Sequence, residues 1–230
     1  MLFIGVDLGT SAVKLLLMDE TGKIHKVVSK EYPLYFPQPG WSEQNPQDWI
    51  RQSMEGIKEL TAQCDKSQIK GISFGGQMHG LVVLDEKDQI IRPAILWNDG
   101  RTGKQTDYLN QEIGKETLSR YTGNIAFAGF TAPKILWMRE KEPENFARIR
   151  RIMLPKDYLA FYLSGEFSTD YSDASGTLLL DVEHKCWSEE MMEICGVRES
   201  QLPKLYESWE PTGAIKPEIA EELGIPQDVK

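Results

Sequence analysis

The chain has 230 residues, of which 40% are hydrophobic and 27% are charged, a composition typical of a globular protein with a sizeable core. Its net charge of −9 argues against a nucleic-acid partner, because nucleic acids are usually bound by a basic face. No apolar stretch approaches the roughly 20 residues of a membrane span, and no cleavable leader precedes the first strand pattern. Three scattered cysteines fit reduced thiols better than a disulfide framework, so we expect a cytoplasmic protein with no membrane partner.

The first apolar run ends in Asp7, and Gly9, Thr10 and Ser11 follow before a second apolar run begins. Two short apolar runs separated by turn residues predict two strands joined by a tight hairpin. Asp7 can supply an oxygen to Mg²⁺ or to one of its waters, and Gly9 lets a phosphate approach the backbone. Thr10 and Ser11 can donate to phosphate oxygens through their amides and hydroxyls. The alternative is an ordinary turn, because the same residue types are common in turns.

The rest of the chain alternates between short strand patterns and helical patterns. Strands are predicted over residues 12–18, 24–31, 69–74, 81–84, 94–97 and 178–180. Helices are predicted from Asn45–Pro46 to Cys64, from Ala132–Pro133 onward, from Pro155 to Gly165, and as short pieces after Trp187. The first three strands should form an antiparallel meander, and the strand at 69–74 should return parallel after a helical crossover. Residues 32–41 and 172–177 are predicted to be loops.

Two further loops carry residues that suit a polar ligand. His79, flanked by Met78 and Gln77, can donate to or accept from a hydroxyl, while the thioether can lie against an apolar face. The alternative is that His79 is a loop histidine that makes its hydrogen bonds within the protein. Trp97 can be core or the wall of a site.

The residues after Trp97 leave their roles open. Asn98 and Asp99 can select hydroxyl stereochemistry, or can simply form a turn. Arg101 can pair with Asp99 or reach a ligand, and the sequence favours neither.

Five motifs occur in an order that resembles the FGGY carbohydrate kinases. These are residues 7–11, 76–80, 96–101, 155–159 and 172–177. The likeness covers essentially the whole chain and is strongest to the branch that phosphorylates xylulose. Glycerol and gluconate kinases share the opening motif but differ around Met78–His79 and at 98–100.

The resemblance implies a ribonuclease-H-like α/β domain of the actin and hexokinase superfamily, with a mixed five-stranded sheet flanked by helices. It implies transfer of a phosphoryl group from ATP, with Mg²⁺, to a ketose such as D-xylulose. Asp7 matches the acid near metal and γ-phosphate, and Gln77, Met78 and His79 match the sugar-contacting loop. Asp157, Asp173 and Ser175 also match family motifs, and we interpret them as structural.

The resemblance also implies a second, nucleotide-binding domain whose glycine-rich turn carries the catalytic base. No Gly-Gly-Asp element occurs in residues 1–230, so we expect one sugar-binding domain that is inactive as a kinase on its own. An apolar face should be exposed where the second domain docks, and a homodimer can form through it. The alternatives are another sugar or polyol kinase of the family (gluconate, ribulose or glycerol), a non-catalytic sugar-binding module, or another ATPase of the actin superfamily.

Overall fold

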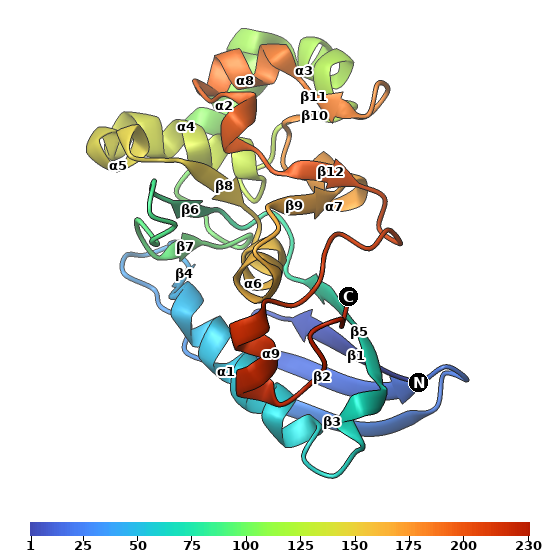
Figure 1. Ribbon diagram of the computed structural model, residues 1–230. Helices are drawn as coiled ribbons and strands as arrows, with labels where there is room; N and C mark the ends of the chain where they lie inside the picture. The colour runs from blue at the N-terminus through green and yellow to red at the C-terminus, as the bar shows by residue number, and fades with distance from the viewer.

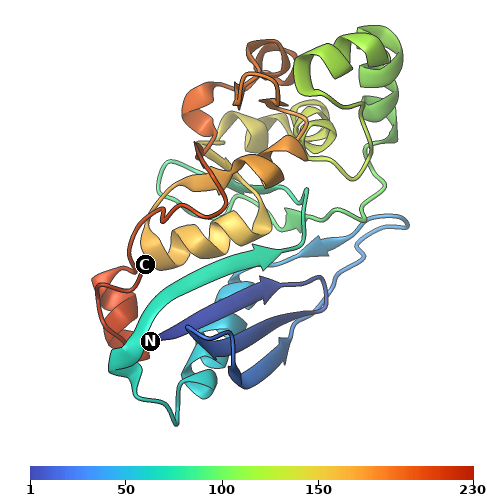
Figure 2. The ribbon, with the colours of Figure 1, turned by 90° about the vertical axis from the view of Figure 1, so that its right-hand side faces the viewer.

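The computed structural model describes residues 1–230 and has a main sheet of four strands in the order β3-β2-β1-β5. β1 (Leu2–Leu8), β2 (Ala12–Asp19) and β3 (Ile24–Glu31) pair antiparallel, which confirms the meander. β5 (Ile69–Gly76) joins β1 in parallel, so both strands end at the same edge of the sheet (Figure 2). The mixed sheet is therefore confirmed, but the predicted number of five strands is wrong by one.

At the outer edge of β5, Lys230 pairs with the strand. The Lys230 N–H donates to the carbonyl of Lys70 at 3.2 Å, and the Lys230 carbonyl accepts from the Ile72 N–H at 2.7 Å. Two bonds in this arrangement form one rung of a parallel ladder. Lys230, at the C-terminus, therefore lies beside β5 at the edge of the sheet (Figure 1).

One face of the main sheet is covered by helices. α1 (Pro46–Leu60), α6 (Pro155–Ser164) and α9 (Pro217–Leu223) lie on it (Figure 1). α1 begins where predicted, because the Asn45 side chain accepts from the Gln47 N–H at 3.1 Å and caps the first turn. Strand side chains alternate between the two faces, so a row from β1 and β2 is buried under these helices: Ile4, Val6, Leu8, Val13, Leu15 and Leu17.

A second apolar cluster lies away from the main sheet, around α4 (Thr131–Lys141). The other helical elements are η1 (Lys66–Gln68), α2 (Gly103–Asp107), the π-helical η2 (Tyr108–Gly114), α3 (Lys115–Thr122), α5 (Pro143–Ala147), α7 (Tyr171–Ser175), α8 (Glu189–Cys195) and η3 (Glu199–Gln201). No helix is both long and apolar enough to cross a membrane.

Four two-stranded pairs complete the structure. They are β4 (Glu43–Gln44) with β7 (Ala94–Ile95), β6 (Val82–Leu84) with β8 (Arg151–Met153), β9 (Ser168–Asp170) with β12 (Lys204–Tyr206), and β10 (Leu180–Asp181) with β11 (Cys186–Trp187). The strand predicted at 94–97 ends before Trp97, which leaves that residue in the following turn.

Two local predictions near residue 175 are wrong. The loop expected at 172–177 contains the helix α7, because the Asp170 side chain accepts from the Asp173 N–H at 3.0 Å and caps a helical turn. The strand expected at 178–180 begins only at Leu180, since Leu178 has a φ of +63°, outside the extended region.

Candidate functional site

Asp7 lies near the end of β1, on the face of the main sheet opposite the buried row. It stands between Lys14 of β2 and Gly75 of β5 in the strand register, and its side chain is exposed. Its neighbours Val6 and Leu8 are buried on the other face. The alternation of the strand therefore presents one carboxylate at the edge where β1 and β5 both end.

The turn after β1 leaves two amides without protein partners. The Gly9 N–H is shared between the carbonyls of Asp7 and Ala12, at 3.1 Å each. A Cβ at Gly9 would lie 2.9 Å from the Ala12 oxygen, so the turn requires glycine. The N–H groups of Thr10 and Ser11 donate to no protein acceptor. Successive free amides beside a carboxylate are suited to a metal-bound phosphate.

Two side chains that the sequence analysis did not single out hold this turn from inside. The Tyr32 hydroxyl donates to the Gly9 carbonyl, and burial together with the nearby Asp7 carboxylate raises the pKa of Tyr32. The Gln44 amide donates to the Thr10 carbonyl at 2.7 Å. Tyr32 directly follows β3 and Gln44 lies in a two-residue strand, so neither belongs to a motif that could have identified it from the sequence.

Gln77 links the end of β5 to the same interior. Its N–H donates to the Leu8 carbonyl at 2.8 Å, and its side-chain NH₂ donates to Gln44 Oε1 at 3.0 Å. The side chain is buried. Of the three residues predicted to contact sugar in this loop, Gln77 thus faces the protein, while the next residue, Met78, is 44% exposed.

His79 is half-buried and held in an unusual conformation. Its φ of +63° is the left-handed region, which is uncommon for a residue with a side chain. The imidazole lies 4.6 Å from the Phe130 ring, and a Cβ at Gly176 would come within 2.4 Å of its Cε1 atom. Burial lowers the pKa of His79 and the ammonium of Lys134 adds to this, so the ring is neutral at pH 7 and can both donate and accept.

The fully buried side chain of Lys134, in α4, fixes the His79 backbone. Its Nζ donates to the carbonyls of His79 at 3.2 Å, Phe130 at 3.0 Å and Gly129. The Thr131 hydroxyl donates to the same His79 carbonyl at 3.1 Å. Burial lowers the pKa of Lys134 to about 7. A lysine on an apolar helix gives no sequence signal of this role.

Trp97 joins the two predicted halves of the site. Its indole is 43% exposed and its Nε1–H donates to Thr10 Oγ1 at 3.0 Å. The residue thus forms an exposed wall beside the turn instead of filling the core, and Asn98 next to it is exposed as well.

The hydrogen-bond partners of Asp99 all belong to the protein. Its carboxylate is buried, and accepts from the Ser42 N–H at 2.6 Å and from Arg101 Nη2 at 2.7 Å. The guanidinium of Arg101 also pairs with Glu43 at 2.8 Å and lies 3.7 Å from the Trp41 ring centroid. Of the two alternatives for Arg101, the structure therefore shows the pair with Asp99. The buried position of Asp99 does not support the hypothesis that it contacts sugar.

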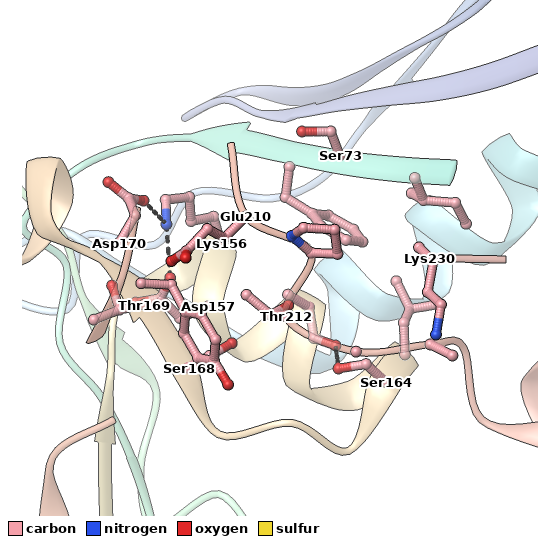
Figure 3. Close-up of a pocket in the computed structure, with 18 of the residues that line it drawn as sticks. Ser73, Lys156, Asp157, Ser164, Ser168, Thr169, Asp170, Glu210, Thr212 and Lys230 are labelled. Carbon is pink, nitrogen blue, oxygen red and sulfur yellow. Dashed lines mark hydrogen bonds and ion pairs between the residues drawn. The ribbon is translucent and has the colours of Figure 1, made fainter. Parts of the chain in front are cut away.

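Two of the residues interpreted as structural, Asp157 and Asp173, contact Lys156. Its ammonium pairs with Asp157 at 2.7 Å, Asp170 at 2.9 Å and Asp173 at 3.1 Å. The Ser175 hydroxyl donates to a carbonyl within its own helix. Lys156 and Asp157 border a pocket of about 160 Å³ between β5, α6 and residues 206–215 (Figure 3). No residue predicted to bind phosphate or sugar lines this pocket, so the pocket and the predicted site are separate.

No group of three or more His, Cys, Asp or Glu side chains is placed to hold a metal ion. Asp7 is a single exposed carboxylate beside two free amides. That donor set fits a Mg²⁺ ion that is carried mainly by polyphosphate oxygens and water, with one carboxylate from the protein.

Curated relatives cover the whole chain. A xylulose kinase from Lactococcus lactis is 47% identical over 229 residues, which are 99% of this chain and 46% of the relative. A xylulose kinase from Escherichia coli is 42% identical over 224 residues, 97% of this chain and 46% of the relative. The chain thus spans about half the length of the curated relatives it matches.

Solved structures agree in fold. A xyloylose kinase from Brucella ovis superposes with a TM-score of 0.95 at 42% identity, over 100% of this chain and 47% of the other. A gluconate kinase from Lactobacillus acidophilus also reaches 0.95 at 31% identity, over 100% and 46%. The family model of the N-terminal domain of FGGY carbohydrate kinases matches residues 2–230. This chain belongs to the FGGY family of carbohydrate kinases.

Proposed function

We propose that the chain is the sugar-binding half of an ATP-dependent kinase that converts D-xylulose to D-xylulose 5-phosphate. The observation that carries this proposal is the hydrogen bond from Trp97 Nε1 to Thr10 Oγ1, because it joins the predicted sugar side to the predicted phosphate side. Phosphoryl transfer depends mainly on holding the two substrates in line and on neutralising charge as it develops.

The residues of the two sides have distinct roles in this proposal. The amides of Thr10 and Ser11 bind phosphate oxygens next to Gly9, and Asp7 binds a water of the Mg²⁺ that accompanies ATP. Neutral His79 binds a ketose hydroxyl, and the exposed Met78 thioether lies against the sugar. When bound, Mg²⁺ supplies charge neutralisation on the transferred phosphoryl group.

Xylulose is the preferred substrate because the relatives that cover the whole chain at 42–47% identity carry that name. The fold alone does not select the sugar, since a gluconate kinase superposes equally well. The selection is therefore assigned to the exposed side chains of the two predicted sugar loops, which are Met78, Trp97 and Asn98.

His79→Ala tests the proposal by isothermal calorimetry with D-xylulose. We expect binding to weaken about tenfold, the effect of losing about 1.4 kcal/mol of hydrogen bonding. The chain alone should bind the ketose weakly and show no ATP-dependent phosphorylation, and both should increase when it is joined to the C-terminal half of a xylulose kinase.

Three outcomes would contradict the proposal. Phosphorylation by residues 1–230 alone would remove the need for a second half. Tight xylulose binding that the second half does not change would favour a non-catalytic sugar-binding module. A parent chain that binds no D-xylulose, even when it is joined to the second half, would favour an ATPase that takes no sugar.

A further inference from the structure

Gln44 is a fully buried side chain whose amide group uses all its hydrogen-bonding capacity. Its Nε2 donates to the carbonyls of Thr10 at 2.7 Å and Pro33 at 3.3 Å. Its Oε1 accepts from Trp49 Nε1 at 3.1 Å and from Gln77 Nε2 at 3.0 Å. A primary amide has two N–H donors and two oxygen lone pairs, so these four bonds saturate it.

The orientation of this amide follows from its partners. A carbonyl oxygen can only accept, and an indole N–H can only donate. The NH₂ group must therefore face Thr10 and Pro33, and the oxygen must face Trp49. Gln77 is left with one way to bond, which is to donate its own NH₂ to Gln44.

The bond to Thr10 also decides where the next amide points. In a planar trans peptide the carbonyl and the following N–H point in opposite directions. Because Gln44 holds the Thr10 carbonyl inward, the Ser11 N–H points out of the protein. Tyr32 does the same one residue earlier, since its bond to the Gly9 carbonyl turns the Thr10 N–H outward. This accounts for the two amides that lack protein partners.

We infer that Gln44 is a positioning residue that aligns the phosphate side of the site with the sugar side. One end of its amide sets the Thr10–Ser11 peptide, and the other end holds Gln77, which immediately precedes Met78 and His79. The inference rests on the proposed function for its substrates. It goes beyond that proposal because it assigns the alignment to a residue that touches neither substrate.

The test is Gln44→Glu, followed by NMR of the Thr10 and Ser11 amides during titration with Mg²⁺–tripolyphosphate. A carboxylate keeps the acceptor for Trp49 and Gln77 but places an oxygen against the Thr10 carbonyl, which releases the peptide. We expect both amide resonances to move on titration in the parent chain, and the affinity to fall at least tenfold in the variant. Tyr32→Phe, which keeps the ring, should weaken binding less and mainly affect Thr10.

The matched control is Gln201→Glu. Gln201 is also buried, donates to the Ile149 carbonyl at 2.7 Å and accepts from the Arg198 N–H at 2.8 Å, but it lies in η3. The Gln201→Glu variant should be less stable than the parent chain but should bind tripolyphosphate with the same affinity. Parent amides that do not respond to tripolyphosphate, or a Gln44→Glu variant that binds as the control does, would overturn the inference. If Gln44→Glu does not fold, unchanged affinity in Tyr32→Phe would overturn it as well.

The proposed function fails separately from the inference. Loss of D-xylulose binding in the parent, with the amide response intact, would contradict the sugar assignment alone. Intact D-xylulose binding, together with an amide response that Gln44→Glu leaves unchanged, would contradict the inference alone.

Discussion

At the scale of single residues, a buried lysine supports the candidate sugar loop. The Lys134 ammonium binds three carbonyls, one of which belongs to His79 in its left-handed conformation. Three N–H donors meet three acceptors, so the hydrogen bonds of the ammonium are satisfied by the backbone, although burial lowers its pKa to about 7. His79 keeps its strained backbone because the surrounding structure holds it there.

Lys134→Met removes these three donors while it keeps the length of the side chain. We expect the free energy of unfolding to fall by about 1–3 kcal/mol, because buried carbonyls lose their partner. Xylulose binding should weaken as well, since the His79 carbonyl keeps only the Thr131 hydroxyl as a donor. Urea denaturation and calorimetry measure the two effects, and a variant that loses stability but binds xylulose normally would separate Lys134 from the sugar loop.

The pKa values of His79 and His184 should be shifted in opposite directions from that of a free histidine. Burial lowers the pKa of His79 below 6.5, whereas the hydrogen bond to Asp181 raises the pKa of His184 above it. Below pH 6.5 the unfolded chain binds more protons at His79 than the folded chain does, so this residue makes stability fall as the pH drops. NMR titration of the imidazole C–H resonances checks both directions, and a His79 pKa above 6.5 would refute the description of its surroundings.

Single residues also show which features of the site could be predicted from a sequence motif and which could not. The sequence pattern around Asp7, Thr10 and Ser11 predicted a turn with free donors, and the structure has two free amides there. The pattern around Asp99 offered Arg101 as a partner but could not choose this pair over a ligand contact, because Arg101 is also held by Trp41 and Glu43, which are distant in sequence.

At the scale of elements, Lys156 joins α6, β9 and α7. Its ammonium lies within 3.1 Å of three carboxylates, one from each of these elements. Burial alone would raise the pKa of Asp170, but the ammonium outweighs it and the pKa is lowered. The stability that this pair contributes is therefore present above pH 4 and is lost as the pH falls through the folded pKa.

Lys156→Met leaves the three carboxylates facing one another. We expect a loss of about 3–5 kcal/mol at pH 7, the cost of breaking a buried ion pair from one side. The loss should be smaller at pH 4, where protonation relieves the repulsion. Guanidinium denaturation of parent and variant at both pH values measures this, and an equal loss at both would rule out the charge as its cause.

Long periodic elements were predictable, and short ones only in part: β6 and β7 lie within the strands predicted at 81–84 and 94–97. The meander, α1 and the parallel strand β5 follow from alternation, an Asn-Pro start and helical spacing within one segment. β8 and β4 have no such signal, because each exists only through a partner strand far along the chain. The polar residues of α7 predict a loop, whereas the residue that caps the helix, Asp170, lies outside the predicted segment.

At the scale of the whole molecule, the buried apolar residues form two clusters. One lies between the main sheet and α1, α6 and α9, and the other surrounds α4. β5 and the loop that follows it run from the first to the second (Figure 1). The candidate site lies at that passage, with Thr10 on the sheet side and Phe130 on the α4 side.

The inward bonds of Tyr32 and Gln44 have a kinetic consequence. A turn that is already ordered loses little conformational entropy when a ligand arrives, so capture of a polyphosphate should be limited by encounter. The chain carries a net charge of −9, which repels a polyanion at long range. Added salt screens that repulsion, so stopped-flow association of Mg²⁺–tripolyphosphate should become faster between about 0.01 and 0.1 M salt, where the Debye length falls from about 30 to 10 Å. A rate that falls with salt would instead indicate a local cationic attraction that outweighs the net charge.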